Sequence, residues 1–136
     1  MENRKELLSE ILRRLQQNYV RMVEIERLTK ELGDALSRSD QDSVLLLLKM
    51  RGDEMDRASE TRSEIQAILQ ALHGEDKKEI EALMAGDRQK EAGDFESEKI
   101  EKISRQLRQT QERIVHIDKA LSRKLAGTDS FYQSAL

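Results

Sequence analysis

The sequence predicts an all-α protein, an elongated antiparallel three-helix bundle or helical hairpin with coiled-coil-like packing. None of its 136 residues is proline, so no position forbids a helix outright. Charged residues make up 38% and aromatic residues 3%, which is typical of long helices joined by thin aliphatic seams. Apolar residues recur every three or four positions over three long stretches, the period of amphipathic helices. The length fits a single helical domain, 1–136.

An amphipathic stripe predicts the first helix, over about residues 3–36. Gly33 lies near its expected C-terminal end, where a left-handed cap would suit a glycine. Asn18 would interrupt the stripe if it faced inward, and we expect it on the exposed flank instead. The apolar residues of the stripe are Leu8, Ile11, Leu15, Met22, Ile25, Leu28, Leu32 and Leu36.

A polar segment, 37–43, separates the first helix from a second one predicted over about 41–73. Ser39 or Asp40 can cap the second helix, because their side-chain oxygens accept protons from free backbone amides. Since the loop is short, the second helix should run antiparallel to the first. Its stripe consists of Val44, Leu48, Met55, Ala58, Ile65, Leu69 and Leu72.

Several residues of the second helix depart from this stripe. Arg51 and Arg62 fall where apolar residues would continue it, so their stems could lie along the seam while their heads pair with acidic side chains. Gly52 costs roughly 1 kcal/mol relative to alanine in mid-helix, so we expect a local kink or a close helix approach there. The Arg51-Gly-Asp53 tripeptide matches an adhesion motif, but inside a predicted helix we interpret it as a coincidence. Gly74 is expected to end the helix at the C′ position.

The remaining chain predicts a connector, a third helix and a tail. The connector, 75–94, holds one short helix around Ile80, Leu83 and Met84. The third helix, over about 95–126, has the most regular heptad pattern of the chain. The tail, 127–136, contains a Phe-Tyr pair that gains nothing from standing free in water, so we expect it to dock on the bundle or on a partner. The heptad residues are Ile100, Ile103, Leu107, Thr110, Ile114, Ile117 and Leu121.

No motif in the sequence predicts catalysis. His73 and His116 are the two histidines, and Glu112 lies four residues before His116 without the further ligands that a metal site requires. There is no nucleophile elbow, phosphate-binding glycine loop or zinc-protease motif. We therefore expect no enzyme activity, no catalytic residue, no metal site and no cofactor.

Charge and hydropathy limit the expected partners. The net charge of −3 argues against non-specific binding to nucleic acid, and the basic residues of the third helix alternate with acidic ones without accompanying aromatics. No apolar run approaches the roughly 20 residues of a membrane span, so we expect no membrane insertion. The N-terminus lacks the apolar core of a signal peptide and the chain has no cysteine, so we expect a cytoplasmic protein.

The apolar seams leave two interpretations open. They could pack only on one another, or one of them, with the third helix as the first candidate, could be partly open and receive a helix of another protein. Helix-in-groove recognition uses the same spacing of three, four and seven residues. A protein-binding role is therefore expected, with a self-associating structural coiled coil, such as a homodimer, as the alternative.

The order of these elements resembles the FlgN family of flagellar type III export chaperones. The most similar stretch is Ala35-Leu-Ser-Arg-Ser-Asp40, followed by Val44-Leu-Leu-Leu-Leu48 and Arg51-Gly-Asp-Glu-Met55. It is similar to the turn in that family, in which Ala-Leu, two residues and a small residue followed by Asp precede a leucine-rich helix. The resemblance covers nearly the whole chain.

This resemblance implies a small, ATP-independent cytoplasmic chaperone. Such a protein binds the amphipathic C-terminal helices of hook-associated proteins, which form the hook–filament junction, prevents their premature assembly and delivers them to the export gate. It places the client on the apolar face of the third helix and makes Tyr132 the candidate contact with the export gate. A FliT-like flagellar chaperone or regulator is a related alternative. The implied client-binding residues are Ile103, Leu107, Ile114, Ile117 and Leu121.

Overall fold

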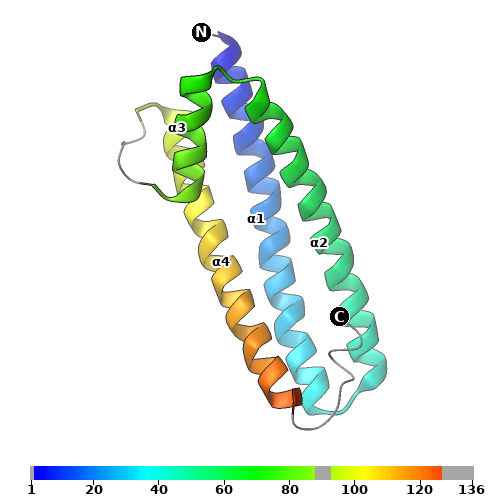
Figure 1. Cartoon of the computed structure of the whole chain (residues 1–136). Coiled ribbons are helices and arrows are strands. Elements are labelled where there is room, and N and C mark those ends of the chain that lie inside the picture. Colours follow the sequence, from blue (N-terminus) through cyan, green and yellow to red (C-terminus); the bar gives the residue numbers. More distant parts are fainter. Residues whose placement is uncertain (1, 88–92, 127–136) are drawn as a thin grey trace.

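The described part of the protein is all-α, as the sequence predicts. The computed structural model describes residues 2–87 and 93–126, which form α1 (Glu2–Ser37), α2 (Gln41–Gln70), α3 (Gly74–Ala85) and α4 (Phe95–Ala126) (Figure 1). The three long helices correspond to the three predicted ones. The short helix α3 corresponds to the one predicted in the connector, and the predicted tail, 127–136, lies outside the described residues.

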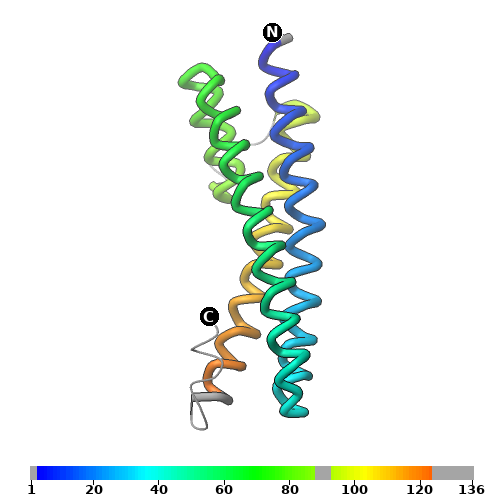
Figure 2. Tube along the Cα trace, turned by 90° about the vertical axis from the view of Figure 1, so that its right-hand side faces the viewer, coloured from blue at the N-terminus to red at the C-terminus, as the bar shows by residue number. Residues whose placement is uncertain are grey.

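The three long helices run in alternating directions, with α2 antiparallel to both α1 and α4. In Figure 1, α1 lies between α2 and α4, and α3 turns back from the end of α2 to lie beside the first half of α4. Figure 2 shows the elongated bundle from the side, with α2 and α4 inclined to each other. Helix α1 therefore packs against both α2 and α4, and an ion pair between Arg51 and Asp118 joins α2 to α4 directly.

A tight turn joins α1 to α2. The amides of Ser39 and Asp40 donate hydrogen bonds to the carbonyls of Leu36 and Ala35 at 3.1 and 3.0 Å, and Ser39 has a positive φ of 56°. This is the left-handed helix ending in which glycine is usual. Asp40, one of the two predicted caps, then accepts from the amide of Ser43 at 3.2 Å and begins α2.

Gly33 is not a cap, so that prediction is wrong. It lies within α1, where an added Cβ would be only 3.1 Å from Cδ2 of Leu121 on α4. The missing side chain thus lets α1 and α4 approach each other. The sequence pattern could not show this, because the reason for the glycine lies on a helix some 90 residues away.

The other two helical glycines also differ from expectation. An added Cβ at Gly52 would meet nothing within 4 Å, so the predicted alternative of a close helix approach is wrong there. Helix α2 ends at Gln70, and Gly74 begins α3 instead of ending α2. The physical reason is that Leu72 turns into the core just after α2, and the chain reverses at His73.

Most of the buried apolar residues belong to one of two clusters. The upper cluster, at the end of the bundle where α1 begins, combines nine buried residues from the four-helix end, and the lower cluster, beside the α1–α2 turn, has three. Five further buried apolar residues lie outside both clusters: Ile25, Leu28, Ala58, Ile114 and Leu121. The upper cluster consists of Leu8, Ile11, Leu15, Ile65, Leu69, Leu72, Ile80, Leu83 and Ile100, and the lower one of Leu32, Ala35 and Val44.

Buried polar side chains lie between the two clusters, in what we call the polar belt. Asn18 is buried there and its Nδ2 donates to the carbonyl of Ala58 at 3.1 Å, so the expected exposed position is wrong. Thr29 donates to the carbonyl of Ile25 within its own helix at 2.7 Å. Such groups are tolerated in a core when they are hydrogen-bonded. The polar belt consists of Asn18, Glu26, Thr29, Arg51, Thr61 and Thr110.

Candidate partner-binding groove

An apolar groove lies between α2 and α4, with α1 as its floor. Its volume is about 210 Å³. Most of its lining is apolar or carries neutral amides and hydroxyls. The floor is Leu15, Asn18 and Met22; the walls are Ala58, Arg62, Ile65 and Gln66 of α2 and Ser104, Leu107, Arg108 and Gln111 of α4; Met84 of α3 closes the upper end.

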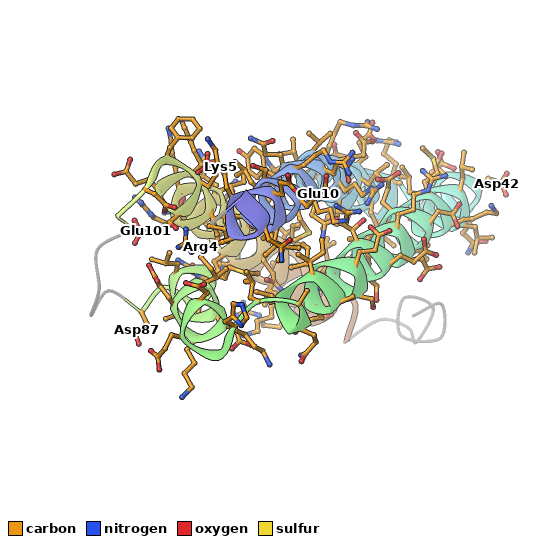
Figure 3. The ribbon with its side chains drawn as sticks, turned by 90° about the horizontal axis from the view of Figure 1, so that it is seen from above. Arg4, Lys5, Glu10, Asp42, Asp87 and Glu101 are labelled. Carbon is orange, nitrogen blue, oxygen red and sulfur yellow. The ribbon has the colours of Figure 1, made fainter. Side chains whose placement is uncertain are left out.

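The groove exists because α3 is short. Viewed down the bundle in Figure 3, α3 lies opposite α1, between the ends of α2 and α4, and so fills the fourth corner of a four-helix arrangement. It ends at Ala85, whereas α1, α2 and α4 continue past it. Below α3, the fourth corner holds no helix among the described residues.

The end of α3 is tied to α4 by Arg108. The guanidinium of Arg108 donates a hydrogen bond to the carbonyl of Met84, in the last turn of α3. Gly86 follows with a φ of 87°, and an added Cβ would lie 2.9 Å from Nη2 of Arg108. The left-handed glycine and the arginine together fix where α3 stops, and hence where the open part of the corner begins.

An ion pair between α2 and α4 closes the lower end of the groove. Arg51, only 6% exposed, donates from both terminal nitrogens to Asp118, at 3.0 and 2.5 Å. The expectation that Arg51 pairs with an acidic residue is confirmed. Arg62 instead lies exposed in the groove wall, and it has no acidic partner among the described residues. About 15 Å of α4 separates Arg108 from Asp118, at 1.5 Å per residue.

Two exposed apolar residues extend the walls toward this ion pair. Met55 is 46% exposed and Val115 is 44% exposed. Met55 lies one turn from Arg51 on α2, and Val115 lies one turn from Asp118 on α4, so both belong to the sides that border the open corner. Met55 was expected in the seam of the second helix, and its exposure corrects that expectation. Flexible methionine side chains suit surfaces that adapt to partners.

The opposite edge of α4 is held against α1 by a second ion pair. Nε of Arg113 donates to Glu26 at 2.8 Å, and this hydrogen bond lowers the pKa of the Glu26 carboxyl below its ordinary value. Glu26 belongs to the polar belt and is nearly buried, whereas Arg113 is about half exposed. This contact favours a closed α1–α4 seam on the side away from the groove.

The five residues that the resemblance assigns to a client lie on the inner side of α4. Ile114 and Leu121 are buried, while Ile103, Leu107 and Ile117 are half-buried. Ile103 and Leu107 pack against the upper cluster, and Leu107 also lines the groove. Contact of a client with the buried Ile114 and Leu121 would require α4 to separate from α1, whereas Ile117 lines a surface hollow between α1 and α4. The client-binding role of these residues stays a prediction. Tyr132 lies outside the described residues.

The groove itself is the feature that sequence reasoning missed. Arg62 gave a partial signal, since it interrupts the predicted stripe of the second helix at the place where the wall opens. The short length of the helix around Ile80 gave another, because a helix of 12 residues cannot cover neighbours of 30 and 32 residues. Neither signal indicates which helices pair with α1, and that pairing decides where the open corner lies.

His73 precedes α3 at its N-cap position, and His116 lies exposed on α4. Within residues 2–87 and 93–126, no three His, Cys, Asp or Glu side chains gather in a way that could hold a metal ion. No helix in the same ranges is long and apolar enough to cross a membrane.

Comparison with protein-family models, with curated proteins and with solved structures finds no match for this chain.

Proposed function

We propose that this protein binds an amphipathic helix of another protein in the groove between α2 and α4, as a chaperone or adaptor without enzyme activity. The observation that carries the proposal is the open fourth corner below α3. A partner helix placed there would cover Met55, Leu107 and Val115 and complete a four-helix cross-section. Burial of such apolar surface is the main driving force of protein association.

The size of the groove supports a helix rather than a small molecule. Its volume of about 210 Å³ lies below the roughly 300–1,000 Å³ of typical ligand pockets, but it suits one or two anchoring side chains. The open stretch between Arg108 and Asp118 is about 15 Å long, nearly three turns of helix. Helix-in-groove recognition places anchors at intervals of three, four and seven residues over such a length.

The sharper form of the proposal is a cytoplasmic flagellar export chaperone. In this form the clients are the amphipathic C-terminal helices of hook-associated proteins, and binding prevents their premature assembly until delivery to the export gate. The turn and leucine run of the FlgN resemblance, 35–40 and 44–48, form the α1–α2 turn and the first turns of α2. The structure adds a groove in which such a client helix would fit.

Self-association is the second candidate function. Leu45 and Leu46 are both more than half exposed on the first turns of α2, next to the lower cluster. Adjacent exposed leucines are typical of surfaces that pair with another protein, including a second copy of the same chain. In this case the apolar surface of α2, and not the groove, would be covered in solution.

The test compares partner recovery by matched variants. Met55→Glu/Val115→Glu places two charges at the rim of the groove, and Val20→Glu places one on an exposed position of α1 as a control. Each tagged protein is used to recover partners from its native cells, which mass spectrometry identifies. All three positions are exposed, so the variants should keep their helices, and circular dichroism checks that they do.

The outcomes separate the candidates. A partner that is lost with the groove variant, retained with Val20→Glu and bound through an amphipathic helix supports the groove. A hook-associated protein as that partner supports the flagellar form. Equal recovery by both variants would refute the groove, and recovery of the chain alone, with a concentration-dependent dimer in sedimentation, would favour self-association.

A further inference from the structure

The charge of the groove differs from that of the whole chain. Acidic residues outnumber basic ones in the sequence, 27 to 24, yet the lining of the groove includes Arg62 and Arg108 and no acidic residue. The two arginines come from facing walls, α2 and α4. The surface offered to an occupant is therefore apolar with a positive rim.

Neither arginine is neutralised by a carboxylate of the described residues. Arg62 has no ion pair there, and the guanidinium of Arg108 donates to the uncharged carbonyl of Met84. Other arginines of the same helices do pair with acids, such as Arg57 with Glu54 and Arg113 with Glu26. Arginine binds carboxylates through parallel hydrogen bonds, which adds geometric selectivity to charge attraction.

A buried hydroxyl in the groove also lacks a partner. Ser104 is 4% exposed, and its Oγ has no hydrogen-bond partner among the described residues. Buried polar groups are nearly always satisfied. Because the Oγ atom itself has almost no accessible surface, an oxygen atom of an occupant would accept this hydrogen bond only after neighbouring side chains move.

We propose that the groove selects protein helices that carry an Asp or Glu one helical turn from a large apolar side chain. The inference rests on the proposed function and names the chemistry of the partner. The apolar side chain would enter between Leu15, Ile65 and Leu107, and the carboxylate would lie between Arg62 and Arg108. Side chains three or four residues apart share one face of a helix, so one segment can supply both.

The experiment is a selection with displayed helical peptides of about 15 residues, a length of roughly four turns. Leucines stay fixed at helical spacing, and the other positions vary among Asp, Glu, Lys, Arg, Gln and Ser. The full-length protein is the bait, beside its Arg62→Gln variant. Arg123→Gln is the control, because Arg123 is likewise an exposed arginine but lies on α4 outside the groove lining, and its Nε donates to the backbone carbonyl of Lys119.

The expected result is enrichment of peptides with Asp or Glu one turn from a leucine. Fluorescence anisotropy should then show that replacing that Glu by Gln weakens binding about three- to tenfold, as for the loss of one partly exposed charge pair. Arg62→Gln should remove most of this difference and Arg123→Gln should preserve it. High salt should reduce the difference, since the rim is open to solvent.

Two other results would overturn the proposal in distinguishable ways. Enriched peptides without an acidic preference, whose binding is still lost in Met55→Glu/Val115→Glu, would refute the carboxylate while leaving the groove in place. Failure to enrich any peptide that depends on the groove would refute the carboxylate and the proposed function together. A Glu-to-Gln difference unchanged by Arg62→Gln would assign the selectivity to another surface.

Discussion

Replacing glycine by alanine at two positions, Gly52 and Gly33, tests the packing of α4 on α1. Gly52→Ala adds a Cβ that meets nothing within 4 Å, so it should raise the free energy of unfolding by about 1 kcal/mol, the helix-propensity difference between the residues. Gly33→Ala gains the same propensity. Its new Cβ, however, would lie 3.1 Å from Cδ2 of Leu121, and only the α1–α4 contact distinguishes the two sites.

The expected cost at Gly33 follows from that distance. Carbon atoms attract best at about 3.5–4.0 Å, so Leu121 must shift or rotate to accept the new methyl group. Leu121 is buried, and overpacking in such surroundings costs about 1–3 kcal/mol. Because the atom concerned is the end of a side chain, we expect the lower limit. The gain and the cost then nearly cancel, and the net change should be within about 0.5 kcal/mol.

Urea unfolding followed by circular dichroism measures these effects in wild type, Gly33→Ala, Leu121→Ala, the double variant and Gly52→Ala. In the Leu121→Ala background the clash is absent, so Gly33→Ala should recover its full gain of about 1 kcal/mol. If Gly33→Ala stabilises the wild type as much as Gly52→Ala does, α1 and α4 do not touch there. The apolar end of α4 would then be free for a client, as the family resemblance implies.

Four further substitutions probe the turn and the two ion pairs. Asp118→Asn removes the bidentate partner of the buried Arg51 and should lower the free energy of unfolding by about 2 kcal/mol, measured in urea. Adding Arg51→Met should restore most of this loss, and a double variant as unstable as Asp118→Asn would contradict the reasoning. Ser39→Gly relieves the positive φ and should stabilise by about 0.5–1 kcal/mol in thermal unfolding, whereas a loss would mean that the serine side chain is needed. Because the pKa of Glu26 is lower in the folded than in the unfolded state, its contribution is complete above its ordinary pKa and is lost as the pH falls through the folded value. Glu26→Gln should therefore show a shallower loss of stability between about pH 5 and 3, and equal slopes would refute a role for its pairing with Arg113.

The helices were predictable because their signal is local. The spacing of Ile100, Leu107 and Ile114 marks the inner side of α4, and the same period marks α1 and α2 within a few residues of their ends. Asp40 was predictable as a cap because capping involves only the next three residues. In contrast, the burial of Asn18 depends on the carbonyl of Ala58 across the bundle, which no local pattern contains.

The candidate site was only partly predictable. Periodicity correctly predicted that Leu107 and Ile114 face inward. However, an inward face has the same sequence pattern whether it packs on α1 or on a partner. The groove depends on the length of α3 and on the pairing of both α2 and α4 with α1. The positive rim required three-dimensional neighbours as well, because Arg62 and Arg108 resemble any other surface arginine until the acidic residues around them are counted.

The uneven division of the core into two clusters has a consequence for local unfolding. The upper cluster joins four helices through nine buried residues, whereas the lower one joins α1 and α2 through three. Amide hydrogen exchange should therefore be slowest near Leu8 and Ile80 and faster near Leu32 and Val44, where opening breaks fewer contacts. With the stable unit at one end, the other end can rearrange around an incoming helix while the fold as a whole persists.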